Sequence, residues 1–289
     1  MIADATAPLC LPPVPMAQPP SSPLPDGTVD THFHVFKAGA PLNTTRSYTP
    51  QIVTLTDWRH YAKASGIARG VLVQPSVYGF DNAVLLEALA SDPQNLRAIA
   101  VLPAETSLDA LRRLDELGVR GVRINTRNKG GLPFDAIADF AGNLAALGWT
   151  LQFQIQPEQL STISSIAPSL GVPVVIDHLG FIALGTDATD GHVADLQRLL
   201  DGGRGYVKLS APYRLTTGTD HRAFGQIVRR LVASHPERLL WGSDWPHTEL
   251  WENMPDDAEL INEMQNWLGN DPVRRQVFAS TAQSLFFSR

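Results

Sequence analysis

Val29-Asp-Thr-His-Phe-His34 is the stretch that decides the fold of this chain. It is a short β-type run with two histidines two positions apart, and residues at that spacing point to the same face of a strand. Further acids and imidazoles follow later apolar runs, as Asp177-His178 and as Asp244-Trp-Pro-His247. Residues so distant in the chain can share one site only if the strands that carry them lie side by side.

Eight short, nearly continuous apolar runs follow one another along the chain, separated by longer amphipathic stretches. Continuous apolar character is typical of strands that are covered on both faces, as in a parallel sheet. The expected strands are Val29–Phe36, Gly70–Pro75, Arg97–Leu102, Gly121–Asn125, Thr150–Gln156, Pro173–His178, Gly205–Leu209 and Leu239–Gly242. The expected helices between them include Asn82–Ala90, Leu108–Leu117, Ala136–Leu147, Val193–Leu200 and Phe224–Ser234. After the last strand, Asp257–Phe287 is expected to form two helices that cover the barrel edge.

This alternation predicts an α/β protein of the (β/α)₈ TIM-barrel class. The length of 289 residues suits such a barrel. An open, doubly wound sheet is the alternative, but no Gly-x-Gly-x-x-Gly turn follows the first strand. We therefore expect a barrel catalytic domain over residues 26–289, with its active site at the carboxyl ends of the strands.

The first 25 residues differ from the rest, because they hold eight of the 22 prolines and no Lys or Arg precedes Lys37. We expect residues 1–25 to form an extended, proline-rich arm against the barrel, and a disordered tail is the open alternative. This segment lacks the basic start and the unbroken apolar run of a secretory signal. No run approaches the roughly 20 apolar residues of a membrane helix. A cytoplasmic protein without a membrane partner is expected.

Charge and cysteine content narrow the function classes further. A net charge of −6 provides no basic field, so nucleic acid is not an expected partner. Cys10 is the only cysteine, which excludes an intramolecular disulfide and a cysteine-based zinc site. The sequence leaves open whether copies of the chain associate into a homo-oligomer.

Polar residues recur where the expected strands end. They are His32, His34, Ser76, Arg123, Asn125, Gln154, Gln156, Asp177, His178, Arg214, Asp244 and His247. A lone His or Asp beside a loop is more often a hydrogen-bonding or capping group, and the four remaining histidines are interpreted in that way. Polar groups that converge on one pocket must be satisfied by each other, by a metal or by a substrate. Their coincidence therefore indicates a functional site.

His32, His34, His178 and Asp244 form a set of three imidazoles and one carboxylate. Such a set suits one zinc or manganese ion with a position open for water. It would also work without metal, with the imidazoles donating hydrogen bonds and Asp244 acting as the general base. Asp177 is expected to point the other way, because adjacent strand residues alternate faces.

Arg123, Lys129 and Arg214 are the cations expected to bind an anionic substrate, since a guanidinium matches a carboxylate. Arg123 lies among apolar residues, so an inward Arg123 needs an anionic ligand or an acidic partner. An ion pair with Asp177 is the alternative. Tyr48 and Ser76 could add hydroxyl donors, and Gln154 and His247 are further expected substrate contacts.

These motifs resemble the amidohydrolase superfamily, and within it the 2-pyrone-4,6-dicarboxylate lactonase-like branch. The resemblance covers nearly all of the chain after residue 27. It rests on Val29-Asp-Thr-His-Phe-His34, Val73-Gln-Pro-Ser76, Gly121-Val-Arg-Ile-Asn125, Ile176-Asp-His-Leu-Gly180, Lys208-Leu-Ser-Ala-Pro-Tyr-Arg214 and Trp241-Gly-Ser-Asp-Trp-Pro-His247. It implies a distorted barrel that hydrolyses lactones, with the three imidazoles and Asp244 at the catalytic centre. It also implies that Tyr48, Ser76, Arg123 and Arg214 surround the anionic groups of the substrate.

The chain departs from the dicarboxylate lactonase at three positions. Lys129 and Phe181 stand where that enzyme has arginines, and Gln154 stands where it has a tyrosine. These departures favour a related anionic lactone, such as 4-sulfomuconolactone or a muconolactone, beside the pyrone dicarboxylate. Two other functions stay open. One is a zinc-dependent, non-oxidative decarboxylase of an aromatic acid, and the other is a non-catalytic barrel that binds a small anion.

Overall fold

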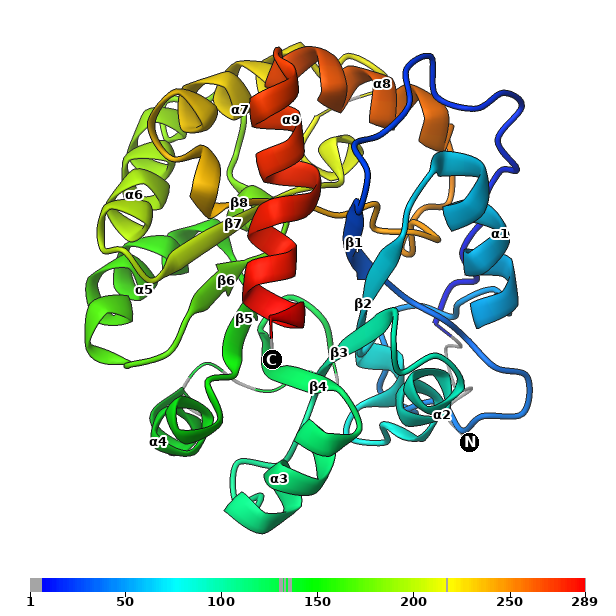
Figure 1. Ribbon diagram of the computed structural model, residues 1–289, viewed down its shortest axis with the longest axis vertical. Helices are drawn as coiled ribbons and strands as arrows, with labels where there is room; N and C mark the ends of the chain where they lie inside the picture. The colour runs from blue at the N-terminus through cyan, green and yellow to red at the C-terminus, as the bar shows by residue number, and fades with distance from the viewer. Residues whose placement is uncertain (1–6, 130–131, 133, 135–136, 217, 289) are drawn as a thin grey trace, which may run out of the picture.

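Eight parallel strands and the helices outside them make up the barrel in the computed structural model (Figure 1). The structure describes residues 7–129, 132, 134, 137–216 and 218–288. The strands neighbour one another in chain order from β1 to β8. The predicted TIM-barrel class is confirmed.

The strands are short and all eight overlap the predicted runs. They are β1 (Val29–Phe33), β2 (Arg69–Val73), β3 (Leu96–Ala100), β4 (Val119–Asn125), β5 (Thr150–Gln154), β6 (Val174–Ile176), β7 (Gly205–Leu209) and β8 (Leu239–Trp241). Four of them, β2, β3, β5 and β6, end two residues before the predicted boundary, and β1 ends three residues before it. At β6 the reason is visible in the backbone, because His178 has a φ of 49° and has left the extended conformation.

The helices follow the strands in regular alternation. They are α1 (Leu55–Ser65), α2 (Ala83–Ser91), α3 (Leu108–Glu116), α4 (Ile137–Leu147), α5 (Leu160–Ile166), α6 (Thr189–Asp201), α7 (Arg222–Ser234), α8 (Asp257–Leu268) and α9 (Asp271–Arg275). Ala136, the predicted start of the fourth helix, lies outside the described residues. After α9, π-helical turns at Gln276–Ser280 and Gln283–Phe287 carry the chain on in the same direction.

A bulge in β1 sets the direction of the first two histidines. The pairing with β2 is irregular between Asp30 and Phe33. Both of these residues face α1, because Trp58 donates its Nε1–H to Asp30 Oδ2 at 3.2 Å and stacks on Phe33 with ring centroids 4.0 Å apart. The extra residue that a bulge inserts lets His32 and His34 both face the barrel interior.

The loop that follows β8 closes the barrel against β1. The backbone N–H of Asp244 donates to His32 O at 2.8 Å, and that of His34 donates to Trp245 O at 2.8 Å. These two backbone hydrogen bonds join the end of β1 to the loop after β8 and fix Asp244 beside His32 and His34.

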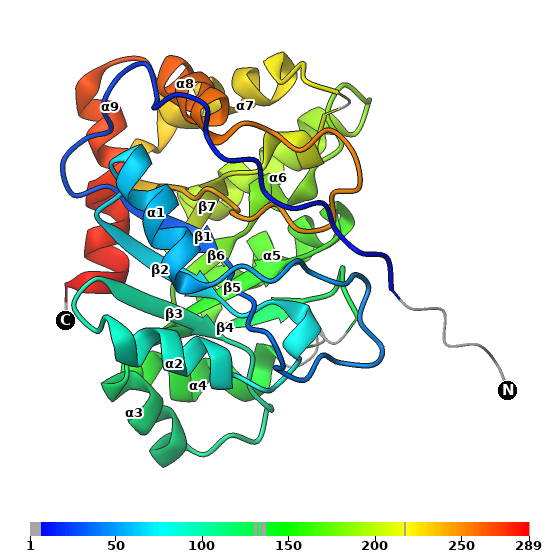
Figure 2. The ribbon, with the colours of Figure 1, turned by 90° about the vertical axis from the view of Figure 1, so that its right-hand side faces the viewer.

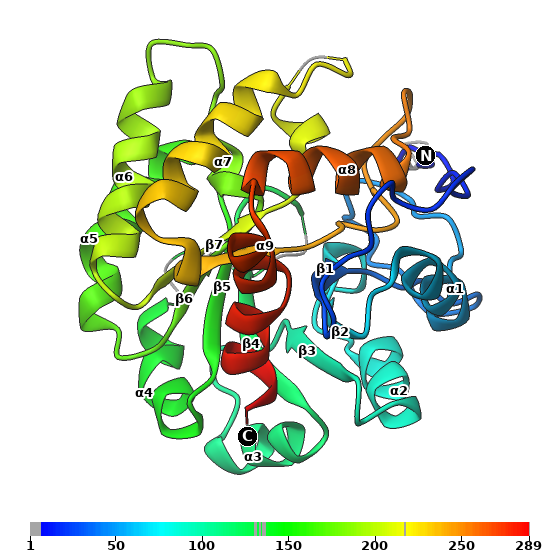
Figure 3. The same ribbon diagram turned by 45° about the horizontal axis from the view of Figure 1, so that its top comes forward.

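The opposite end of the barrel interior is aliphatic. Val29, Val71, Val73, Ile99, Val175 and Leu240 form one buried cluster with Ala282 and Phe286. Figures 1 and 3 show α9 and the turns after it crossing this end of the barrel. We call this cluster the barrel floor.

The described part of the proline-rich segment lies along the barrel (Figure 2). Cys10 N–H donates to Thr49 O at 2.9 Å, and Leu11 N–H donates to Leu250 O at 2.9 Å. Farther on, Ser21 bonds to Asn262 of α8. Residues 1–6 lie outside the described part. Among the residues that are described, no helix has the length and the apolar character that crossing a membrane requires.

Candidate active site

Three imidazoles and one carboxylate meet at the carboxyl ends of β1, β6 and β8. His32 Nε2 and His34 Nε2 are 3.3 Å apart. Asp244 Oδ1 lies 3.7 Å from His32 Nε2 and 3.6 Å from His178 Nε2. All four side chains are buried. The structure therefore brings together the four residues that the sequence singled out.

In two of these imidazoles, the ring nitrogen that points away from Asp244, Nδ1, is held by a hydrogen bond. His34 Nδ1 is 2.7 Å from Val73 O, and His178 Nδ1 is 2.8 Å from Ser210 Oγ. Since a carbonyl only accepts, Nδ1 of His34 carries the hydrogen and Nε2 keeps its lone pair. Burial lowers the pKa of His34 to about 3 and that of His178 to about 4, so both rings are neutral at pH 7.

This arrangement fits a divalent cation. A lone pair on His34 Nε2 only 3.3 Å from another ring nitrogen calls for a shared proton or a metal ion between them. Ligand atoms of His32, His34 and Asp244 all lie within 4.8 Å of one another, and so do those of His32, Asp177 and His178. Nitrogen and carboxylate ligands whose outer atoms are held by hydrogen bonds are typical of a protein metal site.

The expected direction of Asp177 is wrong, because its side chain faces the barrel interior. Its Oδ1 lies 3.3 Å from His32 Nδ1 and 3.2 Å from Lys208 Nζ, and its Oδ2 lies 3.1 Å from Arg123. Val175 and Asp177 share the inward face of β6 and its extension, as alternation requires. The left-handed backbone at His178 then turns the next side chain inward as well.

Lys208 is a buried charge that the candidate set from the sequence omitted. Its Nζ donates to Thr31 O at 2.8 Å and to Gln152 Oε1 at 2.9 Å, beside Asp177. Burial lowers the pKa of Lys208 to about 8, although the nearby Asp177 charge opposes that shift. A lysine in the middle of an apolar strand was the signal that could have found it.

Asp244 is held as a carboxylate. Arg214 Nε donates to its Oδ2 at 2.7 Å, and the Tyr213 hydroxyl donates to the same atom at 2.6 Å. Burial alone would raise the pKa of Asp244, but the charge on the neighbouring Arg214 opposes burial and that pKa lies well below its usual range. Oδ1 remains turned toward the imidazoles.

A small polar cavity opens at this site. Its walls are His34, Tyr48, Ser76, Arg123, Asn128, Gln154, His178, Arg214, Asp244, Thr248 and Glu249. Five of the seven expected substrate contacts are therefore in the wall. Lys129 is exposed, and His247 is buried behind the wall between Tyr213 and Asp257.

Both arginines of the cavity already have acidic partners. Arg123 pairs with Asp177 at 3.1 Å, which is the alternative that the sequence left open, and Arg214 pairs with Asp244. Each keeps one guanidinium nitrogen with weak protein contacts only. NH1 of Arg123 lies 3.5 Å from Gln74 O, and NH1 of Arg214 lies 3.8 Å from Glu249. These two nitrogens remain available to a ligand.

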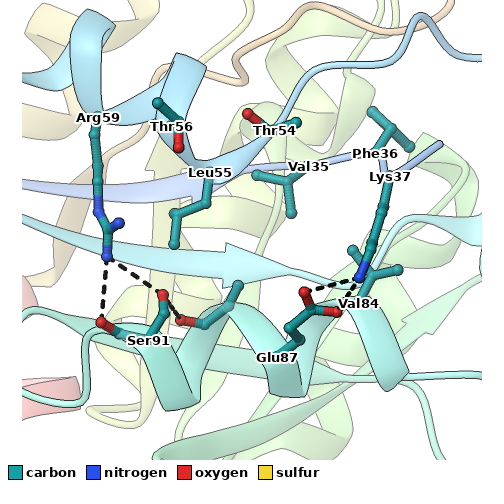
Figure 4. Close-up of a pocket in the computed structure, with 11 residues that line it drawn as sticks. Val35, Phe36, Lys37, Thr54, Leu55, Thr56, Arg59, Val84, Glu87 and Ser91 are labelled. Atoms are coloured by element: carbon teal, nitrogen blue, oxygen red, sulfur yellow. Dashed lines mark hydrogen bonds and ion pairs between the residues drawn. The ribbon is translucent and has the colours of Figure 1, made fainter.

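A larger hollow, of about 300 Å³, lies outside the barrel between α1 and α2 (Figure 4). Its floor is mostly apolar. Lys37 at its rim pairs with Glu87 at 2.6 Å, and Arg59 contacts Ser91 and Asp92. Its cations are thus paired, and none of the residues that line it is a histidine. The smaller cavity at the barrel mouth holds the reactive groups.

The chain is similar to known proteins over most of its length. The amidohydrolase family model (Amidohydro_2) matches residues 29–287. The 2-pyrone-4,6-dicarboxylate hydrolase of Comamonas testosteroni is 33% identical over 261 residues, which are 84% of this chain and 85% of that protein. The 4-sulfomuconolactone hydrolase of Rhizobium radiobacter is 29% identical over 291 residues, 98% of this chain and 97% of that protein. A crystal structure from Agrobacterium tumefaciens shares the fold, with a TM-score of 0.85, 24% identity and coverage of 92% and 98%.

Proposed function

Because the chain belongs to the amidohydrolase family, we propose that it is an enzyme that opens an anionic lactone in the breakdown of aromatic compounds. The observation that carries this proposal is Asp244, a buried carboxylate that faces three imidazoles with lowered pKa values at the wall of a polar cavity. The two lactone hydrolases to which the chain is similar support the same reaction. Lactones like 2-pyrone-4,6-dicarboxylate, 4-sulfomuconolactone and related muconolactones are the proposed substrates.

We propose His32, His34, His178 and Asp244 as the residues that would hold one divalent metal ion, and their nitrogen ligands favour zinc over manganese. Such an ion would supply Lewis acidity at the lactone carbonyl. Two hydrogen bonds support this assignment. Val73 O bonds to Nδ1 of His34 and Ser210 Oγ bonds to Nδ1 of His178, which leaves the Nε2 atoms of both rings for a metal ion. In the metal-free alternative, an imidazole with its hydrogen on the inward nitrogen would donate to the carbonyl oxygen. His34 is not such a donor, because its hydrogen is on Nδ1 and is bonded to Val73 O.

Asp244 is the proposed general base. It would accept a proton from a water molecule as the water oxygen attacks the lactone carbonyl carbon. The ring C–O bond then breaks, and the proton held by Asp244 passes to the departing ring oxygen. Tyr213 and Arg214 hold Oδ2, so Oδ1 is the atom positioned for proton transfer. His247 supports Tyr213 from behind, at 2.8 Å, and is proposed to act through it.

The remaining cavity residues would orient the substrate. The NH1 groups of Arg123 and Arg214 can donate to a carboxylate or sulfonate, and Tyr48 and Ser76 add hydroxyl groups on the same wall. Burial raises the pKa of Tyr48, which keeps its phenol protonated as a donor. Lys129, exposed at the same loop as Asn128, is proposed to attract anions to the mouth.

A lactone panel combined with metal analysis tests this function. The purified protein is assayed with acidic and neutral lactones by acid release, before and after chelation, and its metal content is measured by mass spectrometry. We expect ring opening of acidic lactones and one equivalent of zinc per chain. Release of carbon dioxide from an aromatic acid would instead identify a decarboxylase. Binding without turnover would identify an anion-binding barrel. The cytoplasmic location and the division at residue 25 stay predictions.

A further inference from the structure

Glu249 is a carboxylate in the wall of a cavity that is otherwise suited to an anion. Asp244 has an ion pair of 2.7 Å with Arg214, and Asp177 has one of 3.1 Å with Arg123. In contrast, Glu249 Oε2 lies 3.8 Å from Arg214 NH1, which is longer than a hydrogen bond. Its charge would repel a second anionic group placed beside it.

A directional chain of hydrogen bonds orients Glu249. Arg123 can only donate, so it fixes Gln154 with Oε1 toward the guanidinium. Gln154 Nε2 must then donate to Asn128 Oδ1, at 3.0 Å. The amide of Asn128 in turn donates Nδ2–H to Glu249 Oε1. Each amide is thereby held in one orientation, and the chain ends on a carboxylate that still has acceptor capacity at Oε2.

The backbone of Glu249 is also held firmly. Its φ is 60°, a left-handed conformation that costs energy for a residue other than glycine. The N-terminal segment stabilises it, because Glu249 N–H donates to Cys10 Sγ at 3.2 Å and Leu11 N–H donates to Leu250 O. The side chain and the backbone of Glu249 are therefore both preorganised, which favours specific recognition of a ligand.

We propose that Glu249 determines substrate specificity by accepting a hydrogen bond from a hydroxyl group of the substrate. The preferred substrate is then a lactone with one anionic group, bound by the arginines, and one hydroxyl, bound by Glu249. This inference rests on the proposed lactone hydrolysis. Among the proposed substrates it disfavours lactones with two anionic groups, such as 2-pyrone-4,6-dicarboxylate, and favours related lactones with a single acid group. A preorganised carboxylate that accepts a hydrogen bond from the hydroxyl discriminates against an analogue that lacks it.

Three saturated five-membered lactones test the proposal. The first carries one carboxylate, the second adds a ring hydroxyl, and the third has a second carboxylate in place of that hydroxyl. The wild-type protein should prefer the hydroxylated lactone by roughly 10- to 100-fold in kcat/KM, the range expected for a hydrogen bond to a charged group. Glu249→Leu should remove this preference, and it should improve the dicarboxylate relative to the monocarboxylate. Glu249→Gln, which keeps an acceptor oxygen, should retain part of the preference.

Glu158→Gln is the matched control, because Glu158 is an exposed acid near Arg127 and does not line the cavity. It should keep the wild-type ratio between the lactones. Circular dichroism and thermal melting confirm that each variant is folded. A ratio that Glu249→Leu leaves unchanged, with turnover intact, overturns the proposal for Glu249 and leaves lactone hydrolysis standing.

Lactone hydrolysis can also fail while the role of Glu249 is still tested. If the wild-type protein hydrolyses none of the three lactones, the proposed function fails for this class. Calorimetric titration with the same unreacted lactones then still tests Glu249. Tighter binding of the hydroxylated lactone that is lost in Glu249→Leu supports the specificity role, and equal binding of the first two lactones overturns it.

Discussion

The two ends of the barrel interior are built on the same strands and have opposite chemistry. At the floor, Val29, Val175 and Leu240 pack on Phe286. At the mouth, only two residues farther along from Val175, Asp177 contacts His32, Lys208 and Arg123. One period of a β-strand therefore separates a cluster that stabilises the fold from a cluster of buried charges.

The difference teaches where stability and function are located in this chain. Burial of aliphatic side chains is favourable by about 25 cal/mol for each Å² removed from water. Burial of paired charges such as Lys208 and Asp177 is often no better than an apolar pair of the same volume, because both ions lose their hydration. We infer that the floor supplies folding free energy, and that the mouth keeps its charges for chemistry.

Truncation at the floor should produce the largest effect on stability. Phe286 is 1% exposed, and Phe286→Ala should lower the free energy of unfolding by about 3–5 kcal/mol, since it removes buried area and leaves a cavity. The kcat of the protein that remains folded should change little. Urea unfolding followed by circular dichroism measures the first quantity, and a lactone assay below the melting temperature measures the second.

Phe80→Ala is the control for this prediction, because Phe80 is 51% exposed and should cost much less when truncated. A Phe286→Ala protein that is stable but inactive would contradict this division between floor and mouth, because the floor would then contribute directly to catalysis.

At the mouth, Asp244→Asn should show the reverse pattern. Loss of a positioned base should lower kcat by at least about 10²-fold. The fold should persist, although the buried Arg214 loses its partner at Oδ2 and some stability with it. Asp220→Asn, at an exposed acid paired with Arg222, should keep full activity. Turnover near the wild-type value in Asp244→Asn would sink the assignment of the base.

The sequence was sufficient to predict most of the fold, because the strands are short and largely apolar and the period of the helices differs from that of the strands. It also predicted that His32 and His34 share a face, and their Nε2 atoms are 3.3 Å apart. The remote pair of His178 and Asp244 could be placed with them only through the barrel, in which all strand ends meet at one mouth.

The residues that sequence reasoning missed lie where periodicity gives no information. Asp177 was given the wrong direction because the left-handed backbone at His178 breaks the alternation of faces. Glu249 lies in the irregular loop between β8 and α8, where neither a strand nor a helix period applies. The ion pairs of Arg123 and Arg214 could not be chosen from sequence, since a buried arginine is satisfied equally by an acid or by a ligand.

Arg214→Met should distinguish these two uses of an arginine. It removes the NH1 donor for the substrate and the Nε bond to Asp244, so KM should rise and kcat should fall. For an acidic lactone, kcat/KM should drop by roughly 10- to 100-fold, and a neutral lactone should lose less, because only its catalytic base is affected. Arg230→Met, at an exposed arginine, is the control. Equal losses for both lactones would show that Arg214 serves Asp244 and does not bind the ligand.

The smallest expected effect lies at the side of the barrel, between floor and mouth. Thr54 is the N-cap of α1 and forms a capping box, in which its hydroxyl oxygen accepts from Asp57 N–H at 3.4 Å and its own N–H donates to Asp57 Oδ2 at 2.7 Å. The Thr54 hydroxyl also donates to Asp57 Oδ2, at 2.7 Å. Thr54→Ala should cost about 1 kcal/mol of stability at pH 7 without changing kcat. These hydrogen bonds lower the pKa of Asp57, so their contribution is present above its usual value of 3.8 and is lost as the pH falls through the lowered pKa. The difference in unfolding free energy between the wild type and Thr54→Ala should therefore shrink in acid.

Thr56→Ala, at an exposed neighbour outside the cap, should show no such pH dependence. A fall in kcat for Thr54→Ala would mean that α1 transmits its stability through Trp58 and Asp30 to the histidines of β1. Floor and mouth would then no longer be separable.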